Sequence, residues 1–95
     1  MVKSKDSAII YYTNGTSKDL GHKPTLDEAQ EIVGGWIELV HRTVGNPTFT
    51  GQMIVNEEGL MRGLPINKKG TEIYAMPDYF IVGNIIVLEG KYKLD

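Results

Sequence analysis

Apolar and polar residues alternate with two different periods along the chain, and these periods predict strands and helices in turn. Residues 7–13 (SAIIYYT) are apolar, β-branched and aromatic, which is typical of a strand. The dipeptide Asn14-Gly15 follows them and is the strongest short signal for a hairpin. We therefore expect residues 16–21 to return as a short strand at the edge of a sheet.

The clearest helix is predicted over residues 25–33, where apolar residues recur at spacings of three and four. Thr25 is a candidate N-cap, and Glu28 completes a capping box with it. Gly34 and Gly35 follow, and glycine readily adopts the left-handed conformation that ends a helix. The predicted helix is amphipathic, so its apolar face should pack on the sheet.

A strand is predicted over residues 36–41 (WIELVH). Its alternation points Ile37 and Leu39 to one side of the sheet and Glu38 and Val40 to the other.

Two further strands are predicted. Residues 49–56 should form one, with Met53 and Val55 on the same face. Residues 80–89 (FIVGNIIVLE) are the most apolar run of the chain, so we expect a central strand there, with a bend or bulge at Gly83.

The segment between these two strands predicts a turn and then a short helix. Residues 56–59 have turn composition, with Gly59 expected at a positive φ, and residues 60–64 should continue extended. Asn67 is a candidate N-cap for a helix over residues 68–75, which Pro77 prevents from extending far.

The predicted fold is therefore α+β. It consists of a mostly antiparallel or mixed sheet of about four to six strands, with one main helix over residues 25–33 and one short helix over residues 68–75. Residues 1–95 are expected to form a single domain, with residues 1–6 as a flexible start. The hydrophobic share of 41% is typical of a globular protein.

Several functional classes find no support in the composition. The chain contains no cysteine, which excludes disulfides and thiolate metal sites and fits a reducing compartment. It has neither a long apolar run nor the apolar core of a signal peptide, so we expect no membrane span and a cytoplasmic location. The net charge of −2, without a basic cluster, argues against general nucleic-acid binding.

Catalytic motifs are also missing. There is no Gly-x-Ser-x-Gly sequence, no phosphate-binding loop and no dinucleotide fingerprint, and two histidines without cysteine argue against a zinc site. The sequence thus predicts no enzymatic activity, no catalytic residues, no metal and no cofactor.

A set of short motifs resembles a known family. The stretch 56–59 (NEEG) followed by 63–67 (GLPIN) resembles a phage- and bacteria-associated family of unknown function, domain of unknown function 3846. Residues 26–38, 71–72 and 81–84 fit the same pattern, so that the resemblance covers roughly residues 26–88.

The resemblance implies a compact α+β domain, often carried by phages, and so a viral or mobile-element origin. It transfers no catalytic or binding residue, because the family has no established ones. Gly70 stands where the family pattern suggests alanine, and a glycine there should weaken the second helix.

One placement of charge suggests a ligand site. Lys68 and Lys69 come directly after the N-cap Asn67, where positive charge opposes the helix dipole. Together with Arg62, these residues could hold a phosphate- or carboxylate-bearing molecule at the start of the helix. The alternative is that the two lysines are solvated, or paired with Glu57 or Glu58 of the preceding turn.

The adjacent carboxylates Glu57 and Glu58 are themselves expected to be solvated on their turn rather than to act as an acid–base pair.

A second candidate surface is aromatic. Tyr12 or Trp36, if outward-facing, could form a stacking or protein-binding surface with Arg42. The alternative is that each of these aromatic side chains packs in the core.

Two functional hypotheses remain open at this point. In the first, the chain is a non-enzymatic phage-type accessory or host-interaction protein that binds a host or viral protein. In the second, it binds or sequesters a phosphorylated metabolite or nucleotide signal. Pairing of an exposed edge strand could also produce a homo-oligomer.

Overall fold

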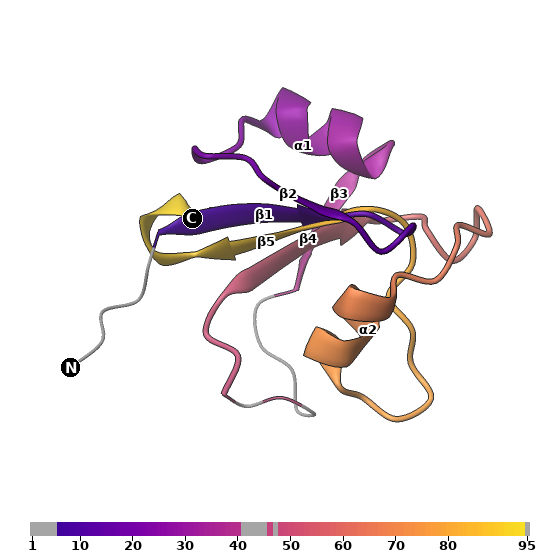
Figure 1. The fold of residues 1–95 in the computed structure, drawn as a ribbon. Helices are drawn as coiled ribbons and strands as arrows, with labels where there is room; N and C mark the ends of the chain where they lie inside the picture. The colour runs from indigo at the N-terminus through magenta and orange to yellow at the C-terminus, as the bar shows by residue number, and fades with distance from the viewer. Residues whose placement is uncertain (1–5, 41–45, 47, 95) are drawn as a thin grey trace.

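A computed structural model describes residues 6–40, 46 and 48–94. Two helices lie on a five-stranded antiparallel sheet whose strand order is β2-β1-β5-β4-β3, which confirms the predicted α+β class (Figure 1). The elements in chain order are β1 (Ser7–Tyr11), β2 (Ser17–Asp19), α1 (Leu26–Val33), β3 (Ile37–Val40), β4 (Gln52–Asn56), α2 (Lys68–Tyr74), β5 (Ile85–Glu89) and a 3₁₀-helix, η1 (Gly90–Tyr92).

The first hairpin is present as predicted. Gly15 adopts a φ of 90°, and the Tyr12 backbone N–H donates to the Thr16 carbonyl oxygen at 2.9 Å. β2 is short, fully exposed and lies at one edge of the sheet. This polar edge strand discourages pairing with another sheet.

α1 has the predicted capping box. The Thr25 side chain accepts from the Glu28 backbone N–H at 3.1 Å, and the Glu28 carboxylate accepts from the Thr25 N–H at 2.9 Å. Gly34 ends the helix in the left-handed conformation. Ala29 and Val33 are buried against one face of the sheet, as their helical spacing predicts.

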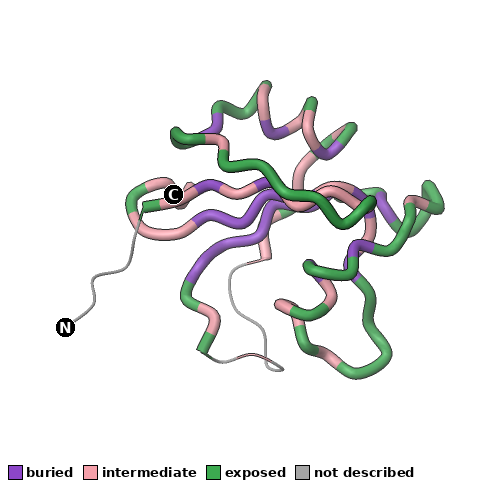
Figure 2. The backbone as a smooth tube through the Cα atoms, viewed as in Figure 1, coloured by how far each residue is buried: buried purple, intermediate pink, exposed green. Residues whose placement is uncertain are grey.

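Both faces of the sheet are apolar, because β4 and most of β5 are buried on both sides (Figure 2). One cluster lies between the sheet and α1, and its buried members are Ala8, Ile10, Ala29, Val33, Ile54, Ile86 and Leu88. The second cluster lies on the opposite face, and its buried members are Met53, Val55, Ile81, Ile85 and Val87. α2 lies beside this second face, toward one end of the sheet (Figure 1).

Asn67 holds α2 in place. Its side chain is fully buried, its Nδ2 donates to the carbonyl oxygens of Tyr11 and Gly83 at 2.9 Å each, and its Oδ1 accepts from the Gly70 N–H. The predicted N-cap is thus confirmed, and it also joins the end of β1 to the bend before β5.

Gly70 has a packing role that the sequence did not reveal. A Cβ atom at this position would lie 2.8 Å from Ile81 Cγ2 and 2.8 Å from Ile85 Cδ1. Glycine therefore allows α2 to approach the second core cluster, and this close approach offsets its low helix propensity.

Two expectations for the turn after β4 are wrong. Gly59 does not adopt a positive φ, which occurs instead at Gly63. A Cβ at Gly59 would lie 2.8 Å from Val82 Cγ2, so close approach rather than backbone conformation favours glycine there. Residues 60–64 are also not extended but form a compact turn, closed by a hydrogen bond from the Leu64 N–H to the Gly59 carbonyl oxygen.

Each of the five predicted strands extends beyond the strand that forms in the structure. The segment 49–56 pairs only as β4. The segment 80–89 forms β5 after the bend at Gly83, whose φ is 79°, and before the bend Val82 makes an isolated bridge with Ile66. β5 is nevertheless the central strand, as its composition predicts. The last residue of the segment 36–41 and nearly all of residues 1–6 lie outside the described residues, so the expectation of a flexible start remains a prediction.

Candidate functional site

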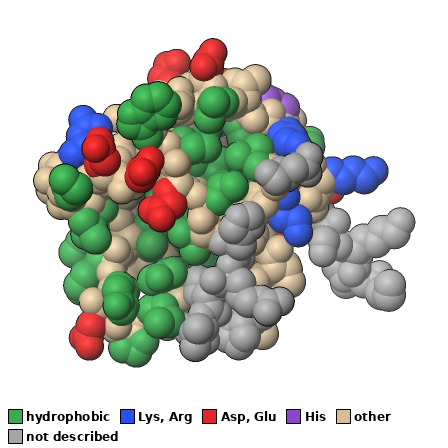
Figure 3. All heavy atoms as spheres, turned by 180° about the vertical axis from the view of Figure 1, so that it is seen from behind, with side chains coloured by type: hydrophobic (Ala, Val, Ile, Leu, Met, Phe, Trp, Pro, Cys, Tyr) green, Lys and Arg blue, Asp and Glu red, His purple; other side chains and the backbone are tan. Residues whose placement is uncertain are grey.

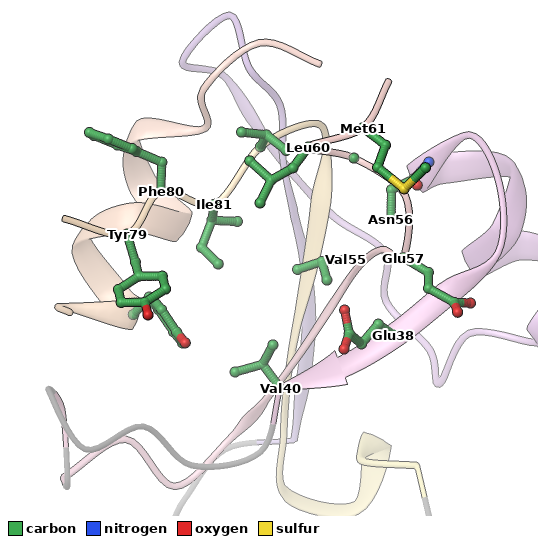
Figure 4. Close-up of a pocket in the computed structure, with 13 residues that line it drawn as sticks. Glu38, Val40, Val55, Asn56, Glu57, Leu60, Met61, Tyr79, Phe80 and Ile81 are labelled. Carbon is green, nitrogen blue, oxygen red and sulfur yellow. The ribbon is translucent and has the colours of Figure 1, made fainter. Parts of the chain in front are cut away.

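The second face of the sheet is only partly covered. Beside α2 it opens into a hollow of about 390 Å³, here called the sheet-face groove (Figure 4). The residues that line it are Glu38, Val40, Val55, Asn56, Glu57, Gly59, Leu60, Met61, Tyr74, Tyr79, Phe80, Ile81 and Val82.

Aliphatic side chains form the floor of the groove. Val40 of β3 and Val55 of β4 point into the central space, and Ile81 meets them from the segment before β5 (Figure 4). Val55 and Ile81 are buried, and Val40 is half-buried. The two-residue period of a strand explains this placement, because Val40 and Glu38 face away from α1 while Ile37 and Leu39 pack toward it.

The rim of the groove is apolar and exposed. Leu60 and Met61 are 75% and 87% exposed, and Tyr79 and Phe80 are 60% and 55% exposed. Hydrophobic side chains gather over part of the face seen from behind, with acidic side chains among them (Figure 3). Contiguous apolar surface of this kind commonly marks an interaction site.

Local backbone geometry turns the two aromatic rim residues outward. α2 ends at Ala75 with a φ of 55°, and Asp78 follows with a φ of 65°. Tyr79 then packs edge-on against Tyr74, with ring centroids 6.3 Å apart and an interplanar angle of 78°. The rim aromatic is thus oriented by a contact with the helix.

One side of the groove carries negative charge. Glu38 and Glu57 lie across the central space from Tyr79 and Phe80 (Figure 4). Both glutamates are exposed, and neither side chain forms an ion pair or a hydrogen bond with another described residue. No lysine or arginine is among the described residues that line the groove.

The structure separates Arg62 from the other residues of the predicted anion site. The Arg62 Nη1 donates to the carbonyl oxygen of Gly34 at 2.7 Å, at the C-terminal end of α1. Asn56 Nδ2 donates to the neighbouring carbonyl oxygen of Val33 at 2.9 Å. Arg62 therefore contacts the end of α1 rather than the start of α2.

The remaining residues of that predicted site are adjacent on the chain but differ in surroundings. Asn67 is fully buried and its side chain bonds within the protein. Lys68 is exposed, and the Lys69 ammonium lies 5.8 Å from the centroid of the Tyr11 ring. The described geometry thus leaves two lysines as the accessible part of the predicted site.

The residues of the predicted aromatic surface are also spread out. Trp36 is 67% exposed, next to Arg62 and Glu58 at a shallower hollow of about 310 Å³. Tyr12 is half-buried against the core on the α1 side and directly follows β1, whereas Trp36 precedes β3. Two strands separate β1 from β3, a span of about 14 Å. Arg42 lies outside the described residues.

Sequence reasoning missed the groove itself. The available signals were the apolar pair Leu60-Met61 inside a polar, glycine-containing turn, and Tyr79-Phe80 directly after Pro77. Glu57 was correctly placed on an exposed turn, but its position beside an apolar hollow depends on the folded sheet.

Two further findings concern the described part of the chain. It contains no group of three or more His, Cys, Asp or Glu side chains that could hold a metal ion. None of its helices is long and apolar enough to cross a membrane.

Comparison with known proteins identifies the family. The family model described as Domain of unknown function (DUF3846) matches residues 7–93, and the chain therefore belongs to this family. The resemblance inferred from residues 26–88 is confirmed and extends to β1 and η1. No curated protein and no solved structure matches the chain.

Proposed function

We propose that this member of the DUF3846 family is a non-enzymatic, phage-type accessory or host-interaction protein that binds a macromolecular partner through the sheet-face groove. The observation that supports this proposal is the groove with its exposed apolar rim, above all Tyr79 and Phe80.

The rim offers free energy to a partner. A phenylalanine side chain contributes about 1.5–3 kcal/mol when it is transferred from water into a fully buried site. Phe80 and Tyr79 are more than half exposed in the isolated chain, so much of this gain remains available. Aromatic residues at the centre of an interface commonly dominate binding.

A binder of a phosphorylated metabolite or nucleotide signal is the competing proposal. Lys68 and Lys69 would be its remaining accessible cations, because Arg62 contacts Gly34. A thermal-shift screen with nucleotides and phosphorylated sugars tests it. A ligand at 100 times its dissociation constant should stabilise the protein by about 2.7 kcal/mol, and replacing both lysines by glutamate should remove this effect.

Affinity capture with matched variants tests the groove proposal. Phe80→Asp places a charge on the groove rim, and Leu26→Asp places the same charge at a comparably exposed apolar residue on α1. We expect proteins captured from a host lysate by the wild-type chain to be retained by Leu26→Asp and lost with Phe80→Asp. Capture that Phe80→Asp leaves unchanged, with the fold verified by circular dichroism, contradicts the proposal.

A further inference from the structure

We infer that the occupant of the sheet-face groove is an extended, basic and apolar segment of a partner protein, which lies along β3 and places a lysine or arginine against Glu38. This inference rests on the proposed function and adds the chemistry and conformation of the partner. Three independent features of the described residues support it: the charge of the groove, the free edge of β3, and the alternation of side chains along that strand.

The charge of the groove selects for a cation. Glu38 and Glu57 are the acidic side chains of its lining, and no described lysine or arginine neutralises them. Two unpaired carboxylates beside an apolar hollow disfavour an acidic partner and attract a basic one. An apolar partner without a cation would partly desolvate these carboxylates and leave them unpaired, which costs free energy.

The edge of the sheet favours an extended conformation. β3, which contributes Glu38 and Val40 to the groove, is an edge strand of the sheet. It pairs with β4, and no other described strand pairs with its outer edge. The Glu57 N–H donates to the Trp36 carbonyl oxygen, which fixes the alternation of the β3–β4 ladder. By that alternation the backbone N–H and C=O groups of Ile37 and Leu39 point away from β4, where an added strand can bond them.

The alternation of side chains on β3 then sets the spacing in the partner. Glu38 and Val40 lie on the groove face, two residues apart, while Ile37 and Leu39 face the α1 side. A strand added along this edge places the side chains of positions i and i+2 beside Glu38 and Val40. The expected pattern is therefore a lysine or arginine separated by one residue from a large apolar side chain.

Selection from a random peptide library tests this pattern even while the partner is unidentified. A library of displayed 12-residue peptides is selected on the full chain, on Glu38→Lys and on the matched control Glu31→Lys, which reverses an exposed charge on α1. We expect the wild type and the control to enrich a basic residue two positions from a large apolar one. Glu38→Lys should instead enrich aspartate or glutamate at the basic position.

The affinity of a selected peptide provides the quantitative test. Fluorescence anisotropy of the labelled peptide should show Glu38→Lys binding at least about tenfold more weakly, which corresponds to about 1.4 kcal/mol. The inference is overturned if the selected peptides show no basic enrichment or show a helical spacing of three or four residues. It is also overturned if the peptide binds the wild type and Glu38→Lys with equal affinity. The absence of any enriched peptide overturns it as well.

Failure of the inference is distinguishable from failure of the proposed function. If Phe80→Asp abolishes the binding of selected peptides or captured proteins but Glu38→Lys leaves it unchanged, the groove is the binding site. Only the inference of a basic, extended partner is then contradicted. If Phe80→Asp also changes nothing, the groove is not the binding site. Thermal melts of each variant establish that the fold is retained.

Discussion

The guanidinium group of Arg62 donates a hydrogen bond of 2.7 Å to the carbonyl oxygen of Gly34, which lies 28 residues earlier in the chain. α1 has no basic residue in its own last turn. A cation is favourable at the negative end of a helix dipole, and here the turn after β4 supplies it from outside the helix. Arg62 thus has a structural partner that its sequence context did not suggest.

Arg62→Ala should lower the free energy of unfolding by roughly 0.5–1.5 kcal/mol, the usual contribution of one hydrogen bond. The urea midpoint measures this change. Lys68→Ala is the control, since it removes another exposed cation without a described hydrogen bond; because Lys68 opposes the dipole at the start of α2, this change should leave the midpoint unchanged or raise it slightly. Equal midpoints for Arg62→Ala and the wild type would show that the bond to Gly34 is not stabilising.

Gly70→Ala should destabilise the protein, although alanine is the better helix former. The added Cβ would overlap Ile81 Cγ2 and Ile85 Cδ1, and overpacking of this kind costs about 1–3 kcal/mol. Ile85→Val removes one of the two overlapping atoms. In a double-mutant cycle the pair should therefore be less destabilising than the sum of the single changes, and strict additivity would contradict the predicted clash.

Asn67→Asp should be strongly destabilising. Aspartate keeps the acceptor for the Gly70 N–H but loses the donor that serves the carbonyl oxygens of Tyr11 and Gly83. Buried groups left unsatisfied cost about 1–3 kcal/mol each. Chemical denaturation measures the loss.

Asn14→Asp is the matched control for that change. The Asn14 Oδ1 only accepts, from the N–H and the hydroxyl of Thr16, and aspartate preserves both bonds. Its midpoint should stay close to that of the wild type. A similar loss for both variants would show that the cost does not come from the Asn67 donor.

Stability should decline in acid partly through Glu28. The hydrogen bond from the Thr25 backbone N–H, and secondarily the one from His22, lower the pKa of Glu28 below its ordinary value of 4.5. A lowered folded-state pKa means that this contribution is complete above the unfolded value and is lost as pH falls through the folded one. Glu28→Gln should flatten the decline in unfolding free energy from pH 6 to pH 3, and parallel curves would contradict this cause.

Leu60→Ser together with Met61→Ser should weaken partner binding without a loss of stability. Both side chains are largely exposed, and surface substitutions usually change the free energy of unfolding by less than about 0.5 kcal/mol. Thermal unfolding and the affinity of a selected peptide, measured on the same preparation, separate the two effects. A marked drop in the melting temperature would show that these residues serve the fold instead.

Local signals predicted the elements that depend on neighbouring residues. The capping box of Thr25 and Glu28, the left-handed Gly34 and the Asn14-Gly15 hairpin all involve contacts within a few residues, so their chemistry is legible in the sequence. The central position of β5 also followed from local composition, because a strand buried on both faces must be apolar throughout.

Contacts between distant segments explain what could not be predicted. Positions 59 and 70 require glycine because other side chains approach them too closely for a Cβ atom. These side chains are Val82, Ile81 and Ile85, from β5 and the segment before it. The groove likewise requires β3, the turn after β4 and the segment after α2 to meet. Its residues carry no motif, since exposed apolar side chains become a site only when the fold gathers them.

The position of β5 has a consequence for how the protein folds during synthesis. β1 pairs with β2 and β3 pairs with β4, but β5 is the only described strand that joins these two hairpin pairs into one sheet. Until residues 85–89 have left the ribosome, the nascent chain holds two separate ribbons with apolar faces exposed to water. Because contacts so distant in sequence form slowly, the nascent protein should be most prone to aggregation, and most dependent on chaperones, just before its central strand emerges.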